Sequence, residues 1–218
     1  MSGHVYTSNI VEWLLTIGEI ILYGVLKTSI NTGLDSELAY VFATPLTIKS
    51  NQPSYVQDMV NLKRRASSQN IQRWEIESYI AQTNNTADFL VHSVDNGFNK
   101  VFPIRMPQPA NLTLSSTPHA TLSDHATGVD TIPVSGAAMY TGEFITFANH
   151  TKVYLIISGG NTIKISPSLR TAVPSGTDIV AGGKVIMQAM YADDAMIGVV
   201  YQQGILTDPG SVKFVEAL

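Results

Sequence analysis

The chain has 218 residues, of which 44% are hydrophobic, so it can bury one large core or two small ones and is not expected to be disordered. It carries 13 Lys and Arg against 17 Asp and Glu, a net charge of -4, which argues against nucleic acid as the main partner. It has no cysteine, which excludes disulfides and thiolate chemistry. Its charged content of 14% is well below the roughly 25% of an average soluble domain. Largely uncharged polar surface suits repeated contacts with other proteins, and also a sugar-binding β-domain.

The first expected element is an apolar segment from Ile10 to Leu26. Its length favours a helix that is buried or shared with a neighbour, and the alternative is two strands that meet at Gly18. Two glutamates interrupt the segment and no Lys or Arg precedes it, so we expect neither a membrane span, which needs about 20 apolar residues, nor a signal peptide. Trp13 and Ile21 in this segment are candidates for contacts with a partner protein.

Three strands are expected next, at Ala39 to Ile48, Tyr55 to Arg64 and Asn70 to Ala81. The last two are predicted to form a hairpin around a basic turn from Lys63 to Asn70. The third strand alternates in polarity, so its residues fall on two faces. One face holds Ile71, Arg73, Glu75 and Glu77, and the other holds Gln72, Trp74, Ile76 and Ser78.

A short helix at Thr86 to Val94 and a strand at Lys100 to Met106 follow, and the prolines from Pro107 to Pro109 then end that strand. Short strands separated by turns are typical of a small barrel or sandwich. This rhythm is seen at Asp130 to Ser135, Glu143 to Ala148, Lys152 to Ile157 and Thr162 to Ser166.

The apolar C-terminal region begins after Gly182-Gly183. Strands are expected at Val185 to Tyr191 and Met196 to Tyr201, and Gly204 to Leu206 is expected to pair with Val212 to Val215. We predict that the last 35 or so residues pair back onto the first sheet, which makes the central module an insertion.

The sequence therefore predicts a mainly β chain with minor α content. Residues 1–108 and 184–218 are expected to form a β-sandwich or split-barrel core with an N-terminal apolar helix. Residues 109–183 are expected to form an inserted small β-barrel module.

No group of residues indicates catalysis, a cofactor or a metal. The five histidines have no ligand spacing, and the sequence lacks both the Gly-x-Ser-x-Gly pattern of hydrolases and the phosphate-loop pattern. Asp193-Asp194 is the only adjacent carboxylate pair, without the further oxygen ligands that calcium needs. We expect neither an enzyme nor a small-molecule substrate.

A basic cluster stands out in this acidic protein: Lys63, Arg64 and Arg65, together with Arg73. Three uses are open for these cations, namely solvation at a hairpin tip, a charged contact with a neighbouring subunit, and binding of nucleic acid.

Two stretches of the sequence resemble tail-tip proteins of tailed bacteriophages, of the distal-tail and baseplate kind. The first runs from Pro45 to Glu77, where a basic turn leads into an Arg73-Trp74-Glu75 strand. The second runs from Asp130 to Val173 and resembles the β-module inserted in those proteins, with a Gly-Glu-Phe-Ile start, a Lys-Val-Tyr strand and a Pro-x-Leu-Arg exit. The segment from Ile10 to Leu26 departs from the minimal pattern of that family.

The resemblance implies a structural virion protein located in the tail tip or baseplate, with assembly in the host cytoplasm. It implies a ring of copies, commonly sixfold, that joins the tail tube, the hub and peripheral tail proteins, and it carries no active site. The alternative is a carbohydrate-binding or adhesin module, for which Tyr140, Phe144 and Tyr154 are the candidate aromatic platforms.

Overall fold

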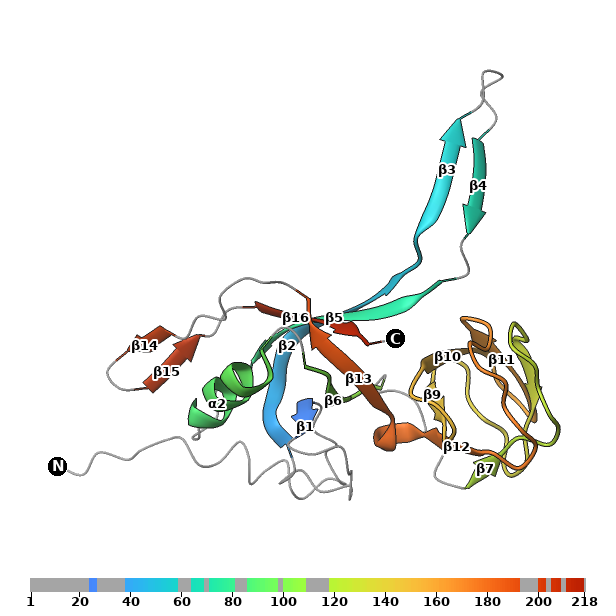
Figure 1. Ribbon diagram of the computed structural model, residues 1–218. Helices are drawn as coiled ribbons and strands as arrows, with labels where there is room; N and C mark the ends of the chain where they lie inside the picture. The colour runs from blue at the N-terminus through green and yellow to red at the C-terminus, as the bar shows by residue number, and fades with distance from the viewer. Residues whose placement is uncertain are drawn as a thin grey trace.

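The computed structural model describes residues 24–26, 38–58, 64–68, 71–80, 86–97, 100–108, 118–192, 200–202, 205–208 and 211–217. These residues form two main sheets and two separate hairpins, with one α-helix (Figure 1). The prediction of a mainly β chain with minor α content is confirmed. Residues 24–26, the last three of the predicted N-terminal helix, form a strand instead, because they pair with strands of the first sheet, and the rest of that segment lies outside the described residues.

The first sheet is a closed, antiparallel barrel of six strands in the order β1-β2-β5-β16-β13-β6. Pairing of Val25 in β1 with Ile104 in β6 closes it. Fully buried side chains from several strands, among them Ile76, Met187 and Phe214, fill the interior. The strands are β1 Gly24–Leu26, β2 Leu38–Asn51, β5 Arg73–Ile80, β6 Phe102–Arg105, β13 Ile186–Tyr191 and β16 Ser211–Glu216.

The sequence pattern of β5 was read correctly, and so was the return of the C-terminal strands. Residues 71–80 alternate between exposed or half-buried and buried positions, as the polarity of the sequence predicts. The C-terminal strand β16 pairs with β5, and β13 pairs with β6. Strands that lie more than 80 residues apart in sequence are therefore neighbours in the barrel.

Helix α2 (Thr86–Asn96) lies against β2, close to the predicted position. Its His92 ring contacts Phe102 edge-on at 4.8 Å, and His92 Nδ1 lies 3.1 Å from the Tyr191 hydroxyl. The inner face of the helix is thereby attached to two strands of the barrel. In the described part of the chain, no helix is both long and apolar enough to cross a membrane.

The second sheet also has six strands, in the order β7-β12-β9-β10-β11-β8. Its two edges approach each other, because Thr121 bridges Val134 and Ser135 N donates to Ala120 O at 2.8 Å. The sheet thus curls around a core of its own that includes Ile145 and Tyr154. The strands are β7 His119–Ala120, β8 Thr131–Pro133, β9 Phe144–Phe147, β10 Val153–Ser158, β11 Thr162–Ser166 and β12 Asp178–Ala181.

The four strands expected between residues 130 and 166 are all present, but β7 and β12 were not predicted. Both are short and polar at one end, so neither has enough period-two alternation to be read from sequence. A 3-10 turn, Gly182–Lys184, leads from β12 back to β13.

Two hairpins stand apart from these sheets. The first pairs β3 (Ser54–Asp58) with β4 (Arg64–Ser68), and the second pairs β14 (Val200–Gln202) with β15 (Ile205–Asp208). Figure 1 shows β3 and β4 as an arm that projects from the barrel beyond the ends of β2 and β5. We call these two strands, residues 54–58 and 64–68, the arm.

Three sequence predictions about these hairpins were wrong. Arg64 to Ser68 form a strand rather than a turn, and β5 pairs with β2 and β16 rather than with the segment after Tyr55. Likewise, β15 pairs with β14, and β16 does not pair with it. The reason is that β5 pairs along the long strand β2, with a register shift between Ala43 and Leu46 around Pro45, and so is not available for a short hairpin.

Candidate functional site

The closed barrel and the second sheet are joined by a buried polar junction. Its centre is Lys152, which precedes β10, and Glu216, at the end of β16, whose side chains are only 4% and 0% exposed. Lys152 Nζ donates to Glu216 Oε2. It also donates to the backbone O of Gln72 at 3.1 Å and to Gln72 Oε1 at 2.7 Å. All three Lys152 protons therefore have acceptors.

The Glu216 carboxylate holds strands of both sheets. Its Oε2 accepts from Trp74 N at 3.0 Å, and its Oε1 accepts from Val153 N at 2.9 Å. Trp74 Nε1 in turn donates to Val153 O at 2.9 Å. One side chain near the C-terminus thus satisfies backbone groups that would otherwise be unpaired between β5 and β10.

Burial and ion pairing have opposite effects on the pKa of Lys152. Burial lowers the pKa of the Lys152 ammonium, and the Glu216 carboxylate opposes that effect by attraction and by a hydrogen bond. A buried pair with every donor and acceptor satisfied has one favourable geometry, because any rotation leaves a charge unpaired at a cost of several kcal/mol, on the order of 3–5. We therefore infer that the Lys152 and Glu216 pair fixes the orientation of the second sheet relative to the barrel.

A second set of buried hydrogen bonds lies around Gln108. Its Nε2 donates to Phe144 O and to Gly182 O, both at 3.1 Å, and its Oε1 accepts from Phe144 N at 3.0 Å. Gly182 N donates to the fully buried Glu143 carboxylate at 3.1 Å. Gln108 precedes, and Gly182 follows, the segment that forms the second sheet. Both chain crossings are thus held in place.

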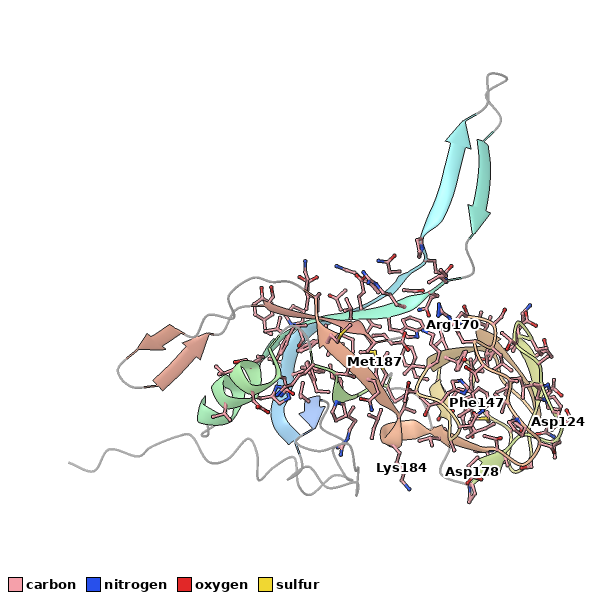
Figure 2. The ribbon with its side chains drawn as sticks, in the orientation of Figure 1. Asp124, Phe147, Arg170, Asp178, Lys184 and Met187 are labelled. Atoms are coloured by element: carbon pink, nitrogen blue, oxygen red, sulfur yellow. The ribbon has the colours of Figure 1, made fainter. Side chains whose placement is uncertain are left out.

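An aromatic contact lies between the two polar junctions. Trp74 from the barrel meets Phe144 of the second sheet edge-on at 5.2 Å, and Phe144 and Val153 belong to the barrel's own core cluster. The interface is therefore apolar in the middle and hydrogen-bonded on both sides, as in a permanent rather than a transient contact. Figure 2 shows side chains filling this region between Met187 and Phe147.

Sequence reasoning did not find this junction. The residue types gave a faint signal, since Glu216 is a lone acid in an apolar C-terminal strand and Lys152 precedes the apolar run Val153 to Ile157. Either could equally be a solvated charge at a strand end. Their partnership joins positions 64 residues apart and depends on the fold.

The predicted interface residues fall in three places. Arg73 lies at the start of β5, exposed, with Nη2 3.2 Å from Glu75 Oε1. Arg64 and Arg65 lie on β4, opposite Asp58 and Gln57. The structure therefore places Arg64 and Arg65 on a different strand from Arg73. Lys63, Trp13 and Ile21 lie outside the described residues.

A ladder of charges covers the outer face of the barrel at the base of the arm. Lys49 Nζ lies 3.0 Å from Glu77 Oε2, and Asn51 Nδ2 donates to Glu75 Oε1 at 2.7 Å. The hydrogen bond from Lys49 is the main cause that lowers the pKa of Glu77. These pairs link β2 to β5 where the two strands leave the barrel, so the arm has a defined base.

The three aromatic residues considered for sugar binding differ in exposure. Phe144 and Tyr154 are buried at 6% and 0%, so neither is a platform, whereas Tyr140 is 44% exposed. The Tyr154 hydroxyl lies 2.9 Å from His150 Nε2 and accepts from Arg170 N at 3.1 Å. Burial raises the pKa of Tyr154 to about 12, so it stays protonated and structural.

Replacing Gly159 by alanine is expected to destabilise the second sheet by about 1–3 kcal/mol. An added Cβ would lie 2.3 Å from Met139 O and 2.8 Å from Thr141 N, both of them backbone atoms that cannot rotate away. Urea unfolding measures the loss. Ser158→Ala is the control, because Ser158 is the exposed residue next to Gly159. Gly176→Ala is unsuitable, because Gly176 has a φ of +77°, at which an alanine is strained.

The His92 contact gives the protein a pH dependence. Burial lowers the pKa of His92 to about 4, against a smaller opposing effect of Asp95. The neutral ring is thus favoured in the folded state, so its stabilising effect is complete above pH 6.5 and is lost as the pH falls towards 4. Because the ring is only partly buried, we expect the loss to be on the order of 1–2 kcal/mol.

Chemical denaturation at pH 7, 5.5 and 4.5 tests this expectation. His92→Gln keeps a hydrogen-bonding group but does not titrate, so its free energy of unfolding is expected to fall less over this range than that of the wild type. Equal pH dependence of the two proteins would contradict the assignment.

In the described ranges, no group of three or more His, Asp or Glu side chains is placed to hold a metal ion. The arrangement of the described residues is instead that of two sheets locked together, with an arm leaving one of them. Comparison with models of known protein families gives no match, and a search of curated proteins gives none either.

Proposed function

We propose that this chain is a structural, non-enzymatic protein of a bacteriophage tail tip or baseplate. In this proposal copies of the chain form a ring, commonly sixfold, that joins the tail tube, the hub and peripheral tail proteins. Its location is the virion tail, with assembly in the host cytoplasm. The proposal combines the resemblance of residues 45–77 and 130–173 to such proteins with the physical properties of the arm.

The arm is the observation that carries the proposal. An isolated two-stranded ribbon is marginally stable in water, because it has no third strand or helix on which to bury a face. Both edges of such a ribbon also present unpaired backbone groups. Within the described residues, β3 and β4 pair only with each other. We therefore infer that the arm is stabilised by binding to another molecule.

The locked junction supports the same proposal. A subunit of a ring must hold its peripheral module at a fixed angle, because an error at each subunit is repeated around the assembly. Lys152, Glu216 and Gln108 provide that fixed angle through fully buried hydrogen bonds. We further propose that residues 109–183 are an inserted small β-barrel module on a ring-forming core made of residues 1–108 and 184–218.

The test is the assembly state of the purified protein. Sedimentation at increasing concentration and negative-stain microscopy are expected to show closed oligomers, either of the chain alone or with tail-tube or hub proteins. A protein that stays monomeric at high concentration and joins neither kind of partner would contradict the proposal.

One observation favours a second function, a carbohydrate-binding or adhesin module. Tyr140 is 44% exposed, so one aromatic ring is available to contact a sugar. Binding on a glycan array that is lost in Tyr140→Ala, but kept in Leu122→Ala, would support it. Leu122 is the control because it is also exposed, at 58%, and lies just after β7 of the same sheet.

A further inference from the structure

An amine, a carboxamide and a carboxylate meet in the buried junction between the two sheets. The side chains of Lys152 and Glu216 are 4% and 0% exposed, and Gln72, which precedes β5, is 2% exposed. Lys152 Nζ lies 2.7 Å from Gln72 Oε1 and also donates to Glu216 Oε2. The three groups are a nucleophile, an electrophile and a proton acceptor, which together can form an amide between two side chains.

The amine lies close to the carbon that it would attack. A C=O bond is about 1.23 Å long, so Gln72 Cδ lies within about 4 Å of Lys152 Nζ. Atoms that are placed to react are typically about 3–3.5 Å apart. Gln72 Nε2 donates to Ser50 Oγ at 3.2 Å, which holds the carboxamide with its carbonyl towards the amine. Ser50 is exposed, so the nitrogen that would leave lies beside a residue at the surface.

The surroundings favour an uncharged amine, which is the form that attacks a carbonyl carbon. Burial between the two sheets lowers the pKa of the Lys152 ammonium. Attraction to Glu216 opposes this effect while both groups are charged. Transfer of one proton along the hydrogen bond from Nζ to Glu216 Oε2 removes both buried charges at once, without the help of water.

We propose that Lys152 and Gln72 form a spontaneous isopeptide cross-link, with Glu216 as the general base. Glu216 takes a proton from the Lys152 ammonium, the amine attacks Gln72 Cδ, and the bond from Cδ to Nε2 breaks. Of the three ammonium protons, one stays on the new amide nitrogen and two leave with Nε2 as an ammonium ion. No other molecule is consumed, and the hydrogen-bonded Lys152 and Glu216 pair is the state before the reaction.

The cross-link joins the barrel covalently to the second sheet. Gln72 leads into β5 of the barrel, and Lys152 leads into β10 of the second sheet. The two residues are 80 positions apart, and a covalent bond that closes such a loop reduces the entropy of the unfolded chain. The cross-linked protein is therefore expected to have a higher Tm than the unreacted one. This inference does not depend on the proposed function.

Intact-mass spectrometry of the wild-type chain tests the cross-link. After prolonged incubation the folded protein is expected to be about 17 Da, one ammonia, lighter than its sequence mass. Protein that is kept in urea and never folded is expected to have the full mass. A tryptic digest is expected to contain a branched peptide that joins Gln72 to Lys152, which distinguishes the cross-link from a cyclised asparagine. Full mass in the folded protein, or a bond from Lys152 to Glu216 with loss of about 18 Da as water, would overturn the proposal.

Three variants test the reacting groups, and circular dichroism verifies that each is folded. Lys152→Met and Gln72→Met are expected to keep their full mass, and Glu216→Gln is expected to react at least about 100-fold more slowly than the wild type. Lys164→Met is the matched control, since it removes an exposed lysine 3.5 Å from Asp130 and is expected to lose ammonia like the wild type. A wild-type rate in folded Glu216→Gln would overturn the role of Glu216. The mass of the wild type decides the proposal even where a variant does not fold.

Discussion

Replacing Glu216 by alanine is expected to lower the free energy of unfolding by about 3–5 kcal/mol. The change leaves the Lys152 ammonium buried without its carboxylate and removes the acceptor of Trp74 N and Val153 N. Unpaired buried charges and amides are among the few causes that make a single substitution this costly. Urea denaturation followed by circular dichroism measures the effect.

Two further variants separate the charge from the hydrogen bonds. Lys152→Met removes the cation but leaves the Glu216 carboxylate with its two backbone donors. Lys152→Met combined with Glu216→Ala removes both charges and completes a double-mutant cycle with the two single variants. We expect the double variant to lose less stability than the two single losses added together, by about 1–3 kcal/mol. Strict additivity would mean that the two side chains do not act as a pair.

The position of Glu216 in the barrel makes this prediction discriminating. Glu216 is the last residue of β16, which pairs with both β13 and β5 in the closed barrel. Removal of β16 is therefore expected to disturb the junction as well as the barrel.

Local patterns predicted the parts of the fold that depend on neighbouring residues. The alternation of β5, the helix at Thr86 and the short strands from residue 131 to residue 166 follow from polarity and turn residues over a few positions. The return of β13 and β16 to the first sheet followed from the apolar character of the C-terminal region. The signals for β5, for the helix and for the short strands each lie within a segment of about 12 residues or fewer, close to the window over which periodicity is read.

Partner choice was the part that the sequence did not predict. The β5 segment was assigned to a hairpin with the residues before it, whereas its partners are β2 and β16, and β16 lies more than 130 residues later. Loop closure over such distances costs little more than over short ones, so proximity in sequence is weak evidence for pairing. The Lys152 and Glu216 pair was missed for the same reason.

The basic residues of the arm were recognised from sequence, and their use in a charged contact was one of three open interpretations. The exposed Val91 and Val94 could not be recognised in the same way, because valines in a short amphipathic helix are usually assigned to the core. The structure instead turns His92 and Ser93 towards the barrel.

Trp74→Ala is expected to separate the unfolding of the two sheets. Each sheet has its own core cluster, but the barrel's cluster takes Phe144 and Val153 from the second sheet, with Trp74 packed against Phe144 at 5.2 Å. We therefore expect the wild-type protein to unfold in one calorimetric transition. Removing the indole costs about 3–5 kcal/mol at this interface and also leaves Val153 O without its donor.

Calorimetry of Trp74→Ala should then show two transitions, of which the lower belongs to the barrel, because the barrel core loses Trp74 itself. Trp74→Phe is the closest control: it keeps an aromatic ring beside Phe144, loses the bond to Val153 O and part of the buried ring volume, and is expected to retain a single transition at a lower Tm. A single transition in Trp74→Ala would show that the hydrogen bonds of Glu216 and Gln108 are sufficient to couple the sheets. Two transitions in the wild type would instead mean that the junction orients the sheets without making them one cooperative unit.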